Sequence, residues 1–167
     1  MKKYKWLVIA VNLILLLVYF NYSVIKKEEL LKDGQLVLLE LAPVDPRSLM
    51  QGDYMALRYN IAEISYNDKL PKRGYCVVRI DSCEVAEKIR FQKDVAPLYE
   101  GEMLIKYYAA NWRNVNIGAE SFFFQEGHAE KYEQAKYGGI KIDNNGNSIL
   151  IGLYDESKKR IKIARLK

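Results

Sequence analysis

Residues 35–62 read QLVLLELAPVDPRSLMQGDYMALRYNIA. Both ends of this stretch are rich in apolar and aromatic residues, whereas its middle contains Pro43, Pro46 and Gly52. A proline fixes its own φ and keeps the preceding residue extended, and a glycine takes backbone conformations that other residues avoid. The pattern therefore predicts a β-strand at each end, joined by a loop of defined shape.

The second of these strands indicates which of its residues face the core. Side chains alternate between the two faces of a strand, so Met55, Leu57 and Tyr59 share one face with Asp53. We assign the first three to the core because they are large and mostly apolar. The other face carries Tyr54, Ala56 and Arg58.

The rest of the chain continues as short runs rich in Val, Ile, Tyr and Phe, separated by turn residues. Such runs with few helices favour a mainly-β domain, either an antiparallel sandwich or a partly open barrel. One short helix is expected over residues 128–137, and Asn144-Asn145-Gly146 predicts a hairpin turn. The expected strands cover residues 35–42, 53–62, 74–81, 84–92, 102–110, 115–125, 139–143, 148–154 and, at an edge, 160–166.

The N-terminal segment is different, because 17 of the 20 residues over 6–25 are apolar or aromatic and none is charged. A helix rises about 1.5 Å per residue and the hydrocarbon core of a bilayer is about 30 Å thick, so roughly 20 residues span it. We therefore expect a single transmembrane helix in the lipid bilayer. The expected organisation is a cytoplasmic N-terminus (1–5), a transmembrane signal anchor (6–25), a stalk (26–34) and an extracytoplasmic β-rich domain (35–167).

Two other interpretations of this segment stay open. A cleaved secretory signal has the same positive start, but it needs small residues at its cleavage site, and residues 19–23 read YFNYS. Such bulky residues are more typical of the aromatic belt at a membrane interface. A buried core helix would require a domain that covers every face of 20 apolar residues.

Charge is distributed unevenly along the chain. The formal net charge is +5, and the lysines at positions 2, 3 and 5 contribute three of these charges, which leaves about +2 for the rest. Only Lys26 and Lys27 follow the apolar run directly, so the positive-inside rule favours a cytoplasmic N-terminus. In the body, Lys and Arg alternate with acidic residues instead of forming one basic block, which argues against nucleic acid as a partner.

Three sequence elements carry a resemblance to a known family. The pattern Gly52-Asp53-Tyr54-x-x-Leu57-x-Tyr59 is complete, residues 43–47 read PVDPR, and residues 124–127 read FQEG. Together with the N-terminal apolar segment, these elements resemble the bacterial GDYXXLXY proteins over nearly the whole chain. The resemblance implies a single-pass protein of the bacterial inner membrane, with a periplasmic C-terminal domain of uncharacterised function, often encoded beside multi-pass membrane proteins. It supplies no catalytic residues.

The two flanking elements supply the candidate structural or ligand loop: Asp45, Pro46, Arg47, Glu126 and Gly127. An Arg guanidinium bonded to a carboxylate would fix the loop shape, and the same groups could hold a ligand. Prolines and a glycine around these charges favour the structural interpretation.

Known catalytic and metal patterns fit the sequence poorly. Ser48 lies too close to Gly52 for the nucleophile of a membrane-bound signal peptidase, and His128 is the only histidine. Cys76 and Cys83 lack the spacing of a metal or redox pair, and we expect free thiols because a two-residue turn would place Cys76 opposite Glu87. Residues 143–147 contain acidic and amide side chains but lack the final acidic ligand of a calcium loop. We expect no metal and no cofactor.

Two functions follow from these observations. The favoured one is an extracytoplasmic binding or assembly module for a multi-pass membrane partner, because no nucleophile and base converge in the sequence. The alternative is a membrane-bound hydrolase with an acidic site around Asp45, Asp53 and Glu126.

Overall fold

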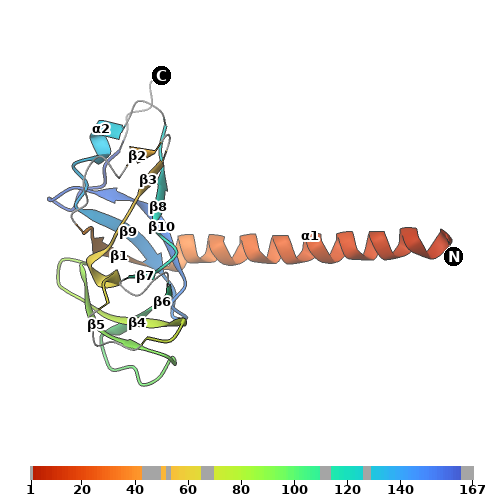
Figure 1. The fold of residues 1–167 in the computed structure, drawn as a ribbon, viewed down its shortest axis with the longest axis horizontal. Helices are drawn as coiled ribbons and strands as arrows, with labels where there is room; N and C mark the ends of the chain where they lie inside the picture. The colour runs from red at the N-terminus through yellow and green to blue at the C-terminus, as the bar shows by residue number, and fades with distance from the viewer. Residues whose placement is uncertain are drawn as a thin grey trace.

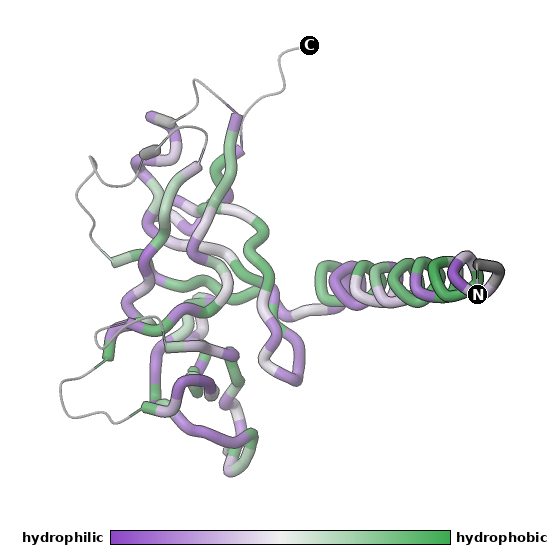
Figure 2. Tube along the Cα trace, turned by 45° about the vertical axis from the view of Figure 1, so that its right-hand side comes forward, coloured by the Kyte–Doolittle hydropathy of each residue, from purple (hydrophilic) through white to green (hydrophobic). Residues whose placement is uncertain are grey.

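The computed structural model describes residues 2–42, 50–51, 54–64, 70–109, 114–125 and 129–162. Helix α1 (Lys2–Asp33) has 32 residues and is long and apolar enough to cross a membrane. Figure 2 shows it as a mostly hydrophobic rod apart from the body, with hydrophilic turns where it approaches the body. The helix covers the expected membrane segment (6–25) and the expected stalk (26–34) except its last residue, Gly34, so the charged residues 26–33 extend it by about two turns.

The body consists of short strands and one short helix, in agreement with the expected mainly-β class. The strands are β1 (Gln35–Glu40), β2 (Met50–Gln51), β3 (Tyr54–Ala56), β4 (Arg73–Ile80), β5 (Ala86–Gln92), β6 (Glu102–Ala109), β7 (Val115–Asn116), β8 (Ser121–Phe123), β9 (Tyr137–Ile142) and β10 (Ser148–Tyr154). The helix is α2 (Ala129–Tyr132), and a 3-10 helix covers Asn60–Ala62.

Three antiparallel sheets are described, with strand orders β1-β9-β10, β2-β3-β8 and β5-β4-β6-β7. None of the three closes into a barrel within the described residues, which leaves an open, layered β arrangement. In Figure 1, α2, β2 and β3 lie at one end of the body and β4 and β5 at the other, and α1 leaves from the side between them. All three sheets contribute side chains to a common hydrophobic core, including Leu39, Met55 and Ile105.

Several expected boundaries were wrong for identifiable physical reasons. The strand expected over 53–62 ends early and turns into the 3-10 helix, and the strand expected over 115–125 splits into β7 and β8 at Gly118, which has φ +83°. The helix expected over 128–137 is described only over Ala129–Tyr132, because Lys136 forms backbone hydrogen bonds with Leu41 and Tyr154 and Tyr137 begins β9. Residues 163–167 of the expected edge strand lie outside the described residues, and Arg160 makes one isolated bridge to Tyr154.

The β9–β10 hairpin turn confirms the prediction for Asn144-Asn145-Gly146. Gly146 has φ +77°, and Asp143 Oδ1 accepts hydrogen bonds from the N–H groups of Asn145 and Asn147 at 2.9 and 2.8 Å. The Asn147 side-chain amide donates to the other oxygen of Asp143. The acidic and amide groups therefore brace the turn.

The two cysteines are free, as expected, but the hairpin register differs from the one assumed. Cys76 lies opposite Phe91, with a bulge between Val77 and Val78, and Cys83 is exposed in a longer loop. Asp81 Oδ1 shapes this loop by accepting the N–H groups of Cys83 and Val85. Burial raises the pKa of the Cys76 thiol to about 12, so it behaves as a small apolar core residue.

Candidate functional site

The described residues of the family motif lie in strand β3 and in the extended segment that follows it. Met55, Leu57 and Tyr59 are 2%, 3% and 1% exposed, which confirms the expected core face. Tyr54 and Arg58 are exposed on the opposite face. Among the described motif residues, Leu57 and Tyr59 therefore point into the core, and Tyr54 points to solvent.

Tyr59 joins three parts of the core. Its hydroxyl donates a hydrogen bond of 2.6 Å to the carbonyl oxygen of Ala119, and its backbone forms an antiparallel bridge with Leu41. Its ring lies against Gly138, where an added Cβ would come within 2.7 Å of Tyr59 Cε1. Burial, with a smaller effect of Glu120, raises the pKa of the hydroxyl above its ordinary value, so it stays a neutral donor.

Leu57 fixes the motif strand to the turn before β8. Its N–H donates to the carbonyl oxygen of Glu120 at 2.7 Å. The Glu120 carboxylate accepts the N–H groups of Gly118 and Ile117 in turn. Glu120 is a residue that the sequence analysis missed, and Gly118 two residues before it was the signal of the turn.

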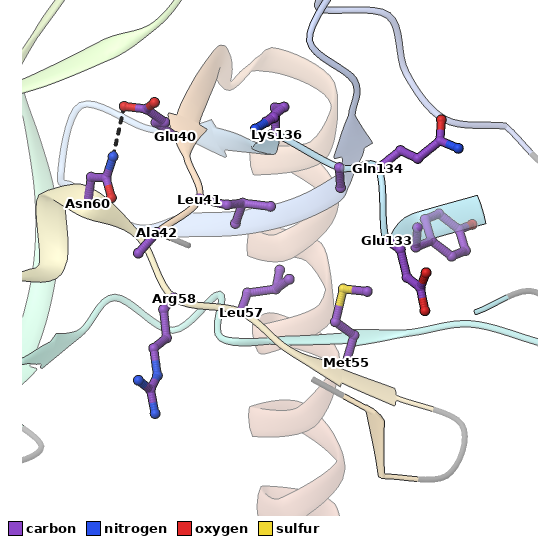
Figure 3. A pocket seen from close by; sticks show the side chains of 12 residues that line it. Glu40, Leu41, Ala42, Met55, Leu57, Arg58, Asn60, Glu133, Gln134 and Lys136 are labelled. Atoms are coloured by element: carbon purple, nitrogen blue, oxygen red, sulfur yellow. Dashed lines mark hydrogen bonds between the residues drawn. The ribbon is translucent and has the colours of Figure 1, made fainter. Parts of the chain in front are cut away.

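A cleft of about 470 Å³ lies beside this strand, between β1 and the segment after α2. Figure 3 shows Leu41 and Leu57 pointing into it and Arg58 pointing away on the other side of the strand. Asn60 Nδ2 donates to Glu40 Oε2 at 2.8 Å on the rim. An apolar floor with a mixed-charge rim has the chemistry and the size to hold an apolar side chain or a small ligand.

The outer face of β3 and β8 carries an exposed aromatic pair. Tyr54 lies opposite Phe123 in the sheet, and their ring centroids are 5.9 Å apart. Phe123 is 74% exposed, whereas its neighbours Phe122 and Phe124 turn inward against Tyr132, with centroid distances of 4.9 and 5.5 Å. Because side chains alternate along a strand, burying two of these phenylalanines exposes the third. We call Tyr54 and Phe123 the aromatic pair.

The remaining sequence candidates lie outside the described residues. These are Asp45, Pro46, Arg47, Gly52, Asp53, Glu126 and Gly127, together with Ser48 and His128. The acidic site of the hydrolase alternative, Asp45, Asp53 and Glu126, therefore stays a prediction. Among the described residues, no cluster of three or more His, Cys, Asp or Glu side chains has the arrangement of a metal site.

A carboxylate in the four-stranded sheet was not anticipated from the sequence. Glu102 is 8% exposed, and Arg90 donates to both of its oxygens at 2.7 and 2.8 Å. The Tyr99 N–H also donates to it, at 3.1 Å. The hydrogen bonds from Arg90 lower the pKa of Glu102, and the Glu102 carboxylate raises the pKa of Arg90 in return. This pair fixes the loop between β5 and β6.

Comparison with known proteins supplies the family. No curated protein and no solved structure matches the chain. The model of the family described as GDYXXLXY protein matches residues 16–153, which include part of α1, the motif and all ten described strands except the last residue of β10. Since this match covers most of the chain, the protein belongs to the GDYXXLXY family.

Proposed function

We propose that the protein is a single-pass, membrane-anchored binding or assembly module of the bacterial inner membrane. In this proposal residues 1–5 are cytoplasmic, residues 6–25 cross the bilayer, residues 26–34 form the stalk, and residues 35–167 form the extracytoplasmic domain. The body binds the extramembrane part of a multi-pass membrane protein through the aromatic pair. The helix lies beside that partner in the same bilayer.

The exposed aromatic pair is the observation that carries this proposal. Aromatic residues are enriched in protein–protein interfaces, because one rigid ring buries a large area at a low cost in conformational entropy. Phe123 gains no such burial in the isolated chain, since most of its surface faces solvent. Tyr54 is a fixed position of the family pattern and yet contributes its ring to this face, whereas Leu57 and Tyr59 serve the core.

The transmembrane segment supports the same proposal. Asn12 lies near the middle of the apolar run, and within the described residues its side chain makes no hydrogen bond. Asn21, in contrast, donates to the carbonyl oxygen of Leu17 at 2.8 Å. A polar amide inside a bilayer favours a hydrogen bond across a helix–helix contact, which a multi-pass partner would supply.

Site-specific photocrosslinking in the native membrane tests the proposal. A photoreactive phenylalanine analogue replaces Phe123, and a matched control replaces Ile89, which is 43% exposed on β5 at the other end of the body. We expect an adduct with a multi-pass membrane protein from position 123 and none from position 89. The absence of an adduct at 123, or the same adduct from both positions, would contradict the proposal.

The orientation has its own test, and no engineered cysteine is needed for it. Cys83 is exposed and Cys76 is buried, so a membrane-impermeant thiol reagent should label the native protein at Cys83. We expect labelling in intact spheroplasts and its loss in Cys83→Ser. Labelling only after lysis would place the body in the cytoplasm.

A further inference from the structure

A groove of about 710 Å³ lies where α1 meets the body. We call it the junction groove. Its helix side is made by Tyr19, Tyr22, Ser23, Lys26, Lys27 and Leu30. Its body side includes Tyr75 of β4, Lys106 of β6 and the hairpin turn with Asn147. The described lining contains three lysines and no acidic residue.

Contacts hold α1 against the body at the junction groove. The helix side and the body side of the groove therefore keep a fixed position relative to each other. Leu30 is buried against the body, and the Gly34 N–H donates to its carbonyl oxygen at 3.0 Å. Lys141 of β9 donates to the carbonyl oxygens of Leu31 and Lys32 at 2.6 and 2.9 Å. These bonds satisfy carbonyl groups that the end of a helix leaves unpaired.

The lysines of the groove form no ion pair within 4.0 Å among the described residues, and Glu29 and Asp143 interact with Lys26 only from farther away. Lys26 Nζ lies 4.8 Å from the centre of the Tyr22 ring, and Lys106 Nζ donates to Asn147 Oδ1 at 2.7 Å. Throughout the described part of the chain, the ion pairs within 4.0 Å involve Glu102 and not these lysines. The nearby Asp143 carboxylate accepts hydrogen bonds from its own turn. The ammonium groups are therefore available to an external anion.

A second basic pocket of about 800 Å³ continues this surface and shares Tyr75 and Lys106 with the junction groove. It adds Lys72, Arg73 and Lys93, and again no acidic residue lines it. The fold thus brings together six cations from four places in the sequence, the end of the charge-free run of α1, the start of β4, the residue after β5 and β6. This is the basic surface that the linear charge pattern did not indicate.

The position of the groove along α1 identifies the source of the anion. The uncharged run ends at Ile25, so Lys26 and Lys27 come at the level where the hydrocarbon core meets the lipid headgroups. Tyr22 and Tyr19, about one and two turns before Lys26, have the amphipathic rings that are enriched at this interface. Figure 1 shows that α1 leaves from the side of the body, between its two ends, so a bilayer crossed by α1 would face the side of the body that carries the groove.

We propose that the junction groove and the second basic pocket bind the phosphate headgroup of an anionic phospholipid in the leaflet next to the body. Lysine ammonium groups supply the charge, and the tyrosine hydroxyls and Asn147 supply hydrogen bonds to phosphate and glycerol oxygens. This inference rests on the membrane anchoring of the proposed function, but it needs neither the multi-pass partner nor the orientation.

Native mass spectrometry of the full-length chain, released from micelles that contain phosphatidylcholine and phosphatidylglycerol, tests the proposal. We expect preferential retention of phosphatidylglycerol. Lys93→Gln with Lys106→Gln should reduce that retention by roughly 25-fold, since each lysine near an anionic surface contributes about five-fold. The matched control, Lys131→Gln with Lys136→Gln, removes the same charge near α2 and should retain the lipid like the unchanged protein.

Three further readouts separate the possible results. Lys93→Arg with Lys106→Arg should keep the lipid, and its loss in the arginine pair would overturn the proposal because charge would then not be the cause. Equal retention of both lipids, or equal loss in both glutamine pairs, would also overturn it.

If soluble glycerol phosphate binds as well as the lipid, the site serves a free phosphate ester and the lipid proposal fails. Crosslinking from position 123 is measured on the same variants, so failure of the partner proposal is seen independently.

Discussion

The three-stranded sheet β2-β3-β8 and the four-stranded sheet β5-β4-β6-β7 present different chemistry to their surroundings. The first exposes the aromatic pair, and the second exposes Lys106 with Lys72, Arg73 and Lys93 beside it. Both sheets contribute their inward side chains to one core. Two chemically different surfaces therefore share one core, so substitutions in the core should disturb both surfaces and substitutions on one surface should disturb only that surface.

The largest expected effect comes from Tyr59, which lies in the common core to which both sheets contribute. Tyr59→Ala removes a buried ring and should lower the free energy of unfolding by about 3–5 kcal/mol. Tyr59→Phe is the matched control, since it keeps the ring but leaves the carbonyl oxygen of Ala119 without its partner, at a cost of about 1–3 kcal/mol. Denaturant unfolding of the full-length protein in detergent measures both. If Tyr59→Ala unfolds like the unchanged protein, one shared core is the wrong description.

The next effect concerns the motif residues outside the described part of the chain. If Asp53 braces the loop before β3, Asp53→Asn should cost about 1.5–3 kcal/mol through a lost charged hydrogen bond. Gly52→Ala should cost more than about 1 kcal/mol if Gly52 has positive φ. Thermal unfolding measures both variants. An Asp53→Asn protein with an unchanged midpoint and no cellular function would favour the hydrolase alternative.

Acid should weaken the four-stranded sheet through Glu102. The Arg90 guanidinium lowers the pKa of this carboxyl in the folded protein, so its stabilising contribution is complete above the unfolded pKa of about 4.3 and is lost as the pH falls through the folded value. We expect the unfolding midpoint to fall over that acidic range, and less steeply in Glu102→Gln. Identical pH profiles for the two proteins would exclude Glu102 as the source.

The smallest effect on stability is expected at the aromatic pair, where the effect on binding is expected to be large. Tyr54→Ser changes an exposed side chain and should shift the free energy of unfolding by no more than about 0.5 kcal/mol. The same change should reduce the photocrosslink from position 123. A large loss of stability would mean that Tyr54 belongs to the structural half of the motif.

Local sequence patterns were sufficient to predict those parts of the structure that depend on residues close together in the chain. The apolar run over 6–25, the alternation over Met55, Leu57 and Tyr59, and the Asn-Gly turn at Gly146 were all predictable, because length, period two and positive φ are properties of short segments. Pairing between distant strands was not predictable in the same way. The early start of β9 at Tyr137 depends on pairing with Glu40, far along the chain, and the bulge that places Cys76 opposite Phe91 has no signal in the residues of its own hairpin.

The long apolar helix, the mainly-β body and the family motif could be predicted from the sequence alone, because each depends on contiguous residues or on a fixed short spacing. Only the tertiary structure decided that Tyr54 of the motif meets Phe123 on the surface, and that Lys26, Lys93 and Lys106 border one continuous basic surface. The physical reason is that side-chain direction and strand register, which bring distant residues together, follow from long-range packing of the core.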